Sequence, residues 1–212
     1  MSSAVYAAKR ATRARVMGLV KAMPRQQIAS ESEFIQKRVL ESAVYRRSKK
    51  IGCYIAMENG NEVDTSMIVR DILRPSSGKQ LWVPFVKKGC SAMRMLRVES
   101  EEDLEPCELF PGVFIRQPKS PETRPDILET GDVLDLVLVP GVAFDKAGAR
   151  LGRGKGFYDG YLQRSEEFAN NHEMQRPRTL GLALSVQVLP QGEVPMSASD
   201  EVLEALVVGN EA

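Results

Sequence analysis

The fold of this chain is decided by residues 133–162, VLDLVLVPGVAFDKAGARLGRGKGFYDGYL. The run 133–139 is apolar except for Asp135, and a continuous run of this kind predicts a strand that is buried on both faces. A proline and a glycine end the strand, and a turn and a glycine-rich loop follow. Aromatic residues at helical spacing from Phe157 onward then predict a helix. The predicted order is strand, cationic loop, helix.

The loop RLGRGKG, residues 150–156, has the composition of an anion-binding site. Glycine allows positive φ and close approach of the backbone to a bulky anion, while the amides, the following helix N-terminus and the cations attract negative charge. The glycine spacing matches neither a P-loop nor a dinucleotide fingerprint. We therefore expect a polyphosphate ligand here, with Asp159 as a carboxylate for the magnesium ion that accompanies ATP. The alternative is a tight connection without a ligand.

The segment FDKAGARLGRGKGFYDGYL, residues 144–162, closely resembles the signature PGxxFDxxGxRLGxGxGYYDxxL of the 5-formyltetrahydrofolate cyclo-ligases, also called methenyltetrahydrofolate synthetases. The Pro-Gly pair that opens the signature is also present, at positions 140 and 141. Phe157 stands where the family has tyrosine, which keeps the ring and loses the hydroxyl. The resemblance extends from Lys9 to about Val208.

This resemblance implies both a fold and a reaction. The fold would be α/β, a three-layer α/β/α arrangement with a mainly parallel sheet of the ribose-isomerase and CoA-transferase type. The reaction would be the ATP- and Mg²⁺-dependent cyclisation of 5-formyltetrahydrofolate to 5,10-methenyltetrahydrofolate, with release of ADP and phosphate. An N5-iminium phosphate would be the intermediate. The nucleophile and the leaving group then belong to the substrates, so the protein need supply mainly alignment and charge stabilisation.

The resemblance also implies residues for each ligand. The residues implied for ATP are Lys9, Arg10, Arg13, Arg150, Leu151, Gly152, Arg153, Gly154, Lys155, Gly156, Phe157 and Tyr158. Those implied for the folate substrate are Ile55, Met57, Glu62, Arg153, Gly154, Lys155, Gly156 and Phe157. The expected catalytic residues are Arg153, Lys155 and Tyr158, and Asp159 is the expected metal ligand. The acidic cluster of the family is reduced here to Glu193 and Asp200, which leaves the second metal ligand open, and Phe85 replaces a frequent arginine.

The rest of the chain predicts alternating helices and strands. We expect helices over residues 1–23 and after Pro24, the second with a capping box of Ser30 and Glu33, and one over 65–73 capped by Asp64. Expected strands are 51–57, 80–85, 93–98, 178–184 and 205–208, with 80–85 and 93–98 forming a hairpin. Residues 99–125 are acidic and proline-rich, and we expect a mostly irregular excursion that packs through its aromatic residues.

Length and composition limit the class of protein. A chain of 212 residues is expected to form a single domain, 1–212. The net charge of +1 argues against a nucleic-acid binder, and no apolar run approaches the roughly 20 residues of a membrane span. Three unpatterned cysteines favour a reducing, cytoplasmic compartment, and we expect a monomer. His172, the only histidine, is expected on a surface loop.

Three alternatives stay open. The acid-free, basic residues 1–23 fit a mitochondrial transit peptide as well as a folded helix. The glycine-rich loop also fits a non-catalytic nucleotide-binding or metabolite-sensing module, although such a module would not need Met57 and Glu62. A sugar-phosphate isomerase of the same fold would use a buried acid-base carboxylate near the loop and would not need ATP.

Overall fold

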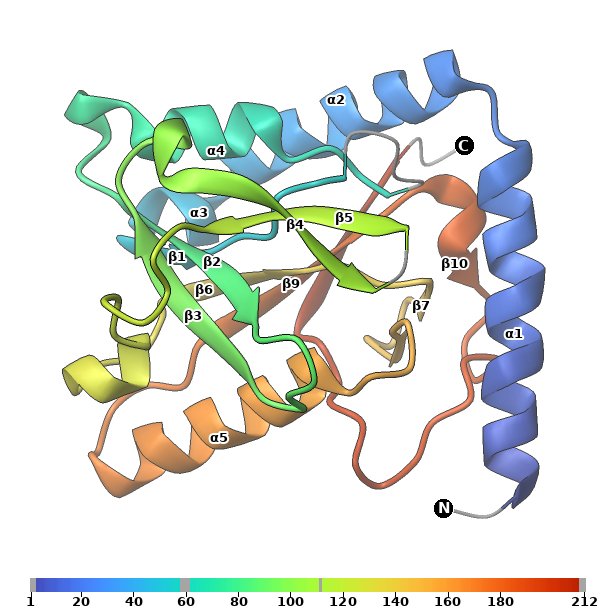
Figure 1. The fold of residues 1–212 in the computed structure, drawn as a ribbon. Helices are drawn as coiled ribbons and strands as arrows, with labels where there is room; N and C mark the ends of the chain where they lie inside the picture. The colour runs from blue at the N-terminus through green and yellow to red at the C-terminus, as the bar shows by residue number, and fades with distance from the viewer. Residues whose placement is uncertain (1–2, 58–61, 111, 210–212) are drawn as a thin grey trace.

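A six-stranded sheet lies at the centre of the computed structural model, which describes residues 3–57, 62–110 and 112–209 (Figure 1). Neighbouring strands in this sheet are parallel except for the last pair, β2 and β3, which form the predicted antiparallel hairpin. In spatial order the strands are β11 (Ala205–Val208), β9 (Arg178–Ala183), β6 (Leu136–Val139), β1 (Lys50–Gly52), β2 (Gln80–Val86) and β3 (Met93–Val98). The expected mainly parallel sheet is confirmed.

Strand β6 explains why the central run of the sequence is apolar throughout. Leu136 and Leu138 belong to the hydrophobic core on one face of the sheet, whereas Val137 and Val139 belong to the core on the other face. The strand is therefore buried on both faces, as predicted, although it begins at residue 136 rather than 133. Asp135, the one charged residue of the run, accepts hydrogen bonds from the backbone N–H groups of Lys49 and Lys50, at the start of β1.

Helices cover both faces of the sheet (Figure 1). Helices α2 (Arg25–Glu41), α3 (Ala43–Arg47) and α4 (Ser66–Leu73) lie on one face, and α5 (Phe157–Asn171) lies on the other. The long helix α1 (Ser3–Ala22) stands beside the small sheet made of β7 (Ala143–Asp145), β8 (Arg150–Leu151) and β10 (Val188–Leu189). Short 3₁₀ turns are η1 (Pro75–Ser77), η2 (Glu101–Asp103), η3 (Ile127–Thr130) and η4 (Ser185–Gln187). No described helix is long and apolar enough to cross a membrane.

Two local predictions are wrong. Ser30 and Glu33 do not form a capping box, because α2 already begins after Pro24, which is the N-cap residue, and Ser30 lies inside the helix. Proline fixes φ and needs no N–H partner, so it can start a helix without a side-chain cap. The strand expected over 51–57 ends at Gly52, after which the chain leaves the sheet. Thr65 rather than Asp64 is the N-cap residue of α4, but the carboxylate of Asp64 accepts from the N–H of Ser66 at the start of the helix, so the prediction for Asp64 holds in part.

The excursion of residues 99–125 is not irregular. It contains a separate antiparallel hairpin of β4 (Leu104–Phe110) and β5 (Val113–Pro118), and Gln117 of β5 accepts a hydrogen bond from the N–H of Val86. Prolines within both strands hid the strand pattern, but a two-stranded sheet has only edges, where proline is tolerated. The expected packing of the aromatic residues is also wrong for Phe114, whose side chain is 58% exposed.

Candidate functional site

The glycine-rich loop joins β8 to α5 and is shaped by glycines at two positions. Gly154 and Gly156 have φ of 94° and 68°, values that side-chain-bearing residues rarely adopt, and Gly156 is the N-cap residue of α5. The loop itself is exposed, while Leu151 is buried in the core at its start. Leu151 can therefore contact a ligand only through its backbone. The predicted order of strand, exposed cationic loop and helix is confirmed.

Helix α1 brings a second set of cations to this loop. The Nε of Arg13 donates a hydrogen bond of 2.7 Å to the carbonyl of Gly152, across 139 positions of sequence. The guanidinium also lies against Gly154, where an added Cβ would come within 3.3 Å of its central carbon. The neighbouring Arg10 is exposed. The long helix and the loop therefore form one cationic surface.

Lys9 is held by the chain itself. Its side chain is buried, and its Nζ donates to the Oγ of Ser197 at 2.9 Å and forms an ion pair with Asp200. Burial alone would raise the pKa of Asp200, but hydrogen bonds from Lys9 and Ser197 outweigh burial and hold that pKa below its ordinary value. Lys9 thus anchors α1 to the segment before β11, one helical turn from Arg13.

Arg150 and Asp159 form a buried ion pair beneath the loop. The guanidinium donates to the Oδ1 of Asp159 at 2.7 Å, and the two side chains are 3% and 17% exposed. Gly152 packs against this pair, and an added Cβ there would lie 2.9 Å from an Arg150 nitrogen, so that the guanidinium would have to shift. The same oxygen of Asp159 accepts from the backbone N–H of Glu201 at 3.2 Å. Arg150 therefore faces Asp159 rather than the loop surface.

The predicted metal ligands can be compared by position. Within the described residues no group of three or more His, Cys, Asp or Glu side chains is placed to hold a metal ion. Asp200 is followed by Glu201, whose backbone N–H donates a hydrogen bond to Asp159. Glu193 instead lies on the surface, with a carboxylate oxygen 3.7 Å from a guanidinium nitrogen of Arg15. Magnesium in phosphoryl-transfer sites is usually held by one or two carboxylates together with substrate phosphates. The donor set Asp159 and Asp200 fits that requirement, and Glu193 does not share the location.

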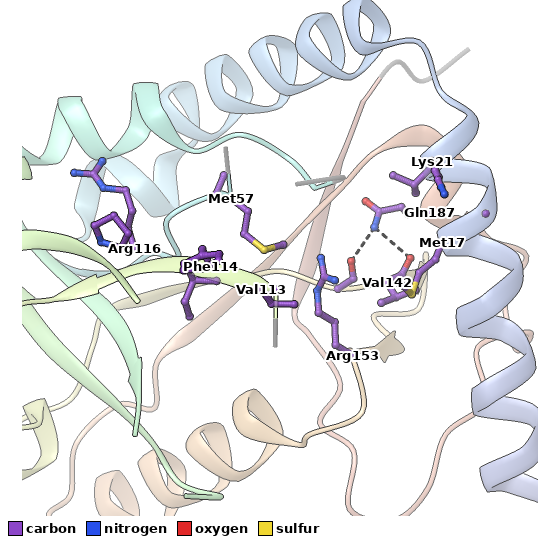
Figure 2. A pocket seen from close by; sticks show the side chains of 16 residues that line it. Met17, Lys21, Met57, Val113, Phe114, Arg116, Val142, Arg153 and Gln187 are labelled. Atoms are coloured by element: carbon purple, nitrogen blue, oxygen red, sulfur yellow. Dashed lines mark hydrogen bonds between the residues drawn. The ribbon is translucent and has the colours of Figure 1, made fainter. Parts of the chain in front are cut away.

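A cavity of about 540 Å³ opens beside the loop (Figure 2). It lies between α1, the β4–β5 hairpin and the chain after β1, and Arg153 of the loop forms part of its wall. Gln187 closes another part and donates hydrogen bonds to the carbonyls of Gly141 and Val142, drawn as dashed lines in Figure 2. The lining residues labelled there are Met17, Lys21, Met57, Val113, Phe114, Arg116, Val142, Arg153 and Gln187. The cavity combines an apolar wall with cations, which suits an aromatic anion.

Glu62 connects Met57, in the cavity wall, to Arg153 of the loop. One carboxylate oxygen accepts from the N–H of Met57 at 3.1 Å, and the other lies 3.6 Å from a guanidinium nitrogen of Arg153. Burial raises the pKa of Glu62 above its ordinary value of 4.5, against the opposing effects of the Met57 hydrogen bond and the Arg153 charge. Ile55, the third residue expected on the folate side, is half-buried and lies on the same segment. Glu62 therefore lies beside the loop, and Met57 is joined to it through the hydrogen bond to this carboxylate.

The aromatic pair after the loop turns inward. Phe157 is half-buried and packs against the core beneath α5. The hydroxyl of Tyr158 is buried without a hydrogen-bond partner among the described residues, and its ring centre lies 5.8 Å from the guanidinium carbon of Arg150. Burial raises the pKa of Tyr158 strongly, so the phenol is neutral and can donate a hydrogen bond.

Glu62→Gln should change how stability depends on pH. A carboxyl group whose pKa is raised by folding contributes stability below its unfolded pKa and loses it as the pH rises through the folded pKa. Going down from about pH 7 toward 4.5, the wild type should therefore gain stability relative to Glu62→Gln. Urea unfolding of both proteins over this range measures the difference. A difference that does not vary with pH would show that Glu62 is not buried in this way.

Sequence reasoning missed part of the cavity wall. The sequence predicts an irregular segment around Phe114, whereas Val113–Pro118 forms strand β5 and its first residues line the cavity. The single hint was the presence of one turn-like Pro-Gly pair between two short apolar runs. No sequence pattern around Met17 or Gln187 indicates that these residues line a cavity, because tertiary packing alone brings them to its wall.

Comparisons with known proteins agree with one another. A family model described as the 5-formyltetrahydrofolate cyclo-ligase family matches residues 5–209. The 5-formyltetrahydrofolate cyclo-ligase of Mus musculus is 34% identical, over 92% of this chain and 91% of its own length. The mitochondrial 5-formyltetrahydrofolate cyclo-ligase of Arabidopsis thaliana is 36% identical, over 96% of this chain and 74% of its own length.

Solved structures give the same result for the fold. An NMR structure of the 5,10-methenyltetrahydrofolate synthetase of Aquifex aeolicus superposes with a TM-score of 0.71 and 27% identity, over 94% of this chain and 89% of that chain. The 5,10-methenyltetrahydrofolate synthetase of Mycoplasma pneumoniae has a TM-score of 0.63 at 20% identity, over 94% and 97% of the two chains, and supports the fold alone.

Proposed function

The chain belongs to the 5-formyltetrahydrofolate cyclo-ligase family and is an enzyme of that class; from this premise we propose that it uses ATP and Mg²⁺ to cyclise 5-formyltetrahydrofolate to 5,10-methenyltetrahydrofolate. The main support for the proposal is the ion pair between Arg153 and Glu62, in which a guanidinium nitrogen lies 3.6 Å from a carboxylate oxygen. It joins a loop suited to phosphates to a buried carboxylate suited to the N–H donors of a pterin. A phosphoryl donor and a folate bound on the two sides would meet at this contact.

The proposed reaction has two steps. The formyl oxygen attacks the γ-phosphorus of ATP, the bond to ADP breaks, and an N5-iminium phosphate forms. N10 then attacks the iminium carbon and loses its proton, and the carbon–oxygen bond breaks to release phosphate as the ring closes. The substrates supply both nucleophiles and both leaving groups, so the chain has to align them and stabilise the transferring charge.

Each part of the site has a proposed role in these steps. Arg153, Lys155 and the loop amides hold the phosphates, and Arg13 and Arg10 extend the cationic surface from α1. The neutral phenol of Tyr158 donates a hydrogen bond near the reacting formyl group. Magnesium, bound with ATP, supplies charge neutralisation for the transferring phosphoryl group. Asp159 and Asp200 would hold that ion, and Arg150 and Lys9 neutralise these two carboxylates in the ligand-free chain.

An absorbance measurement tests the proposal directly. The purified protein is mixed with 5-formyltetrahydrofolate, and the ultraviolet absorbance of methenyltetrahydrofolate is followed with and without ATP and magnesium. A rise that requires both establishes the reaction. If ATP binds but no product forms, the chain is a nucleotide-binding module. If a sugar phosphate is isomerised without ATP, it belongs to the isomerase class.

Asp159→Asn should raise the magnesium concentration needed for half-maximal rate by about tenfold or more, because one charged oxygen ligand is lost. Asp200→Asn should have an effect in the same direction, and Glu193→Gln should have none. Rates are measured across a magnesium titration at fixed ATP. Lys9→Met is a useful control, since it breaks the ion pair with Asp200 and leaves both carboxylates in place. Equal magnesium midpoints in all four variants and the wild type would remove the two carboxylates from the metal site.

We propose a cytoplasmic monomer with residues 1–212 as one domain. Helix α1 contributes Arg13 to the loop and anchors Lys9, so removing residues 1–23 as a transit peptide would remove part of the site. This favours a retained helix over a cleaved leader.

A further inference from the structure

One connection, from β1 to α4, carries all the residues expected on the folate side: Ile55, Met57 and Glu62. Its two ends are held by different neighbours. After β1, the N–H of Cys53 donates to the carbonyl of Trp82 in β2, at 2.9 Å. Before α4, the N–H of Asp64 donates to the Oγ of Ser32 in α2, at 3.1 Å. The sheet and α2 therefore fix where the connection leaves the core and where it returns.

Two buried hydrogen bonds join these two ends directly. The hydroxyl of Tyr54 donates to the carbonyl of Val63 at 2.9 Å, and the hydroxyl of Thr65 donates to the carbonyl of Tyr54 at 2.8 Å. Tyr54, Val63 and Thr65 are 5%, 1% and 1% exposed, so water cannot readily replace either bond. The two bonds close the connection at its base, on both sides of the folate-side residues.

The role of Thr65 differs from the usual one for its position. Thr65 is the N-cap residue of α4, where a threonine side chain normally accepts from a backbone N–H of the first helical turn. Within the described residues its side chain makes no such capping bond. The N–H of Met67, in that first turn, donates instead to the Oε1 of Gln36 in α2, at 2.8 Å. Helix α2 thus supplies the cap, and the Thr65 hydroxyl is used to close the connection.

The closed base lies next to the carboxylate of the site. Val63, whose carbonyl accepts from Tyr54, directly follows Glu62 in the chain. Glu62 itself is held only by the N–H of Met57 and by Arg153, at 3.1 and 3.6 Å. A binding group has to be kept within about 0.5 Å of its working position by the contacts behind it. At Glu62 the bond to Val63 is the buried contact placed to do this.

We infer that the hydroxyls of Tyr54 and Thr65 position Glu62, through Val63, to receive the N–H donors of the folate. Both hydroxyls bond to backbone carbonyls of the chain, so they act through Glu62 rather than on the ligand. They should therefore affect binding of the folate and leave phosphoryl transfer unchanged. The inference rests on the proposed function and adds two positioning residues to its folate side.

Tyr54→Phe removes one hydroxyl and keeps the ring. The KM for 5-formyltetrahydrofolate should rise about tenfold, because binding then has to order the connection that the hydroxyl bond holds in the wild type. The value of kcat and the KM for ATP should stay within about twofold of the wild type. Thr65→Val should act in the same direction, whereas Thr65→Ser keeps the hydroxyl and should retain the KM of the wild type. Steady-state rates at varied folate and varied ATP measure all four proteins.

Tyr45→Phe is the matched control. Tyr45 is another buried tyrosine, and its hydroxyl donates to the Oδ2 of Asp71 at 2.7 Å, but it lies on α3 and does not line the cavity beside the loop. Its loss should leave the KM for the folate unchanged. An equal rise in this KM for Tyr45→Phe and Tyr54→Phe would show a general loosening of the fold and overturn the inference.

A double variant tests whether Tyr54 acts through Glu62. If it does, Tyr54→Phe should add less than about twofold to the folate KM once Glu62→Gln is present. Effects of the two changes that multiply in full would mean that Tyr54 affects binding by another route, and the inference would fail.

Hydrogen exchange separates failure of this inference from failure of the proposed function, because it needs no substrate. The N–H of Met57 is bonded to Glu62, so its exchange rate reports how well that carboxylate is held. Exchange should be about tenfold faster in Tyr54→Phe than in the wild type, and unchanged in Tyr45→Phe. Absence of turnover with every folate would overturn the proposed function and leave this comparison valid. Equal exchange at Met57 in Tyr54→Phe and the wild type would overturn the inference.

Discussion

Lys155→Ala should lower kcat by about 10²- to 10³-fold, because one cation aimed at the developing charge of a transferring phosphoryl group is worth that much in comparable sites. Lys155 lies between Gly154 and Gly156, both with positive φ, in the exposed part of the loop directly before α5. The charge of its side chain adds there to that of the helix N-terminus. Turnover is measured by the absorbance of the product at saturating ATP and folate.

Stability should separate this effect from misfolding. An exposed side chain outside the core contributes little to folding, so Lys155→Ala should unfold in urea within about 0.5 kcal/mol of the wild type. Lys146→Ala is the matched control, because Lys146 is an exposed lysine in the turn that precedes β8 and should leave kcat unchanged. Lys155→Arg should recover part of the lost rate, since charge is kept and geometry is altered. A kcat for Lys155→Ala within threefold of the wild type would remove the residue from the reaction.

The loop and the central sheet could be predicted because their signals are local. An apolar run followed by glycines, cations and helical spacing indicates strand, loop and helix within 30 residues, and β6, the loop and α5 follow that order. The alternation of side chains between two cores explains why the run needed no polar positions. Asp135 was the apparent exception, and its bonds to the start of β1 are tertiary contacts that no local pattern contains.

The arrangement of charges around the loop could not be predicted, because it depends on which partners the fold brings together. The spacing of Lys9 and Arg13 correctly indicated one face of a helix. Only the structure shows that Lys9 pairs with Asp200, whereas Arg13 contacts the loop at Gly152. The cavity beside the loop is a stronger case, since its wall combines α1, the chain after β1 and a hairpin that the sequence did not reveal. Prolines within both strands of that hairpin mask its pattern in the sequence.

Arg150→Met should destabilise the protein by about 3–5 kcal/mol, because it removes the cation of a buried ion pair and leaves the carboxylate of Asp159 without its counter-charge. The Arg150 side chain is 3% exposed and reaches Asp159 at 2.7 Å, so solvent cannot replace the lost charge. Lys37→Met breaks an exposed pair with Glu33 and should not change the unfolding midpoint measurably, which makes it the matched control. The free energy of unfolding in urea is the quantity to compare.

The double variant Arg150→Met/Asp159→Asn distinguishes loss of charge balance from loss of packing. If the cost of Arg150→Met comes from the stranded carboxylate, neutralising Asp159 as well should recover a large part of the lost stability. If the cost comes from the cavity left by the guanidinium beside Gly152, the double variant should be no more stable than the single one. Recovery would mean that Arg150 serves to balance the charge of Asp159, the carboxylate that would hold the metal ion. No recovery would mean that Arg150 serves mainly to pack the base of the loop, and its link to the metal site would have to be abandoned.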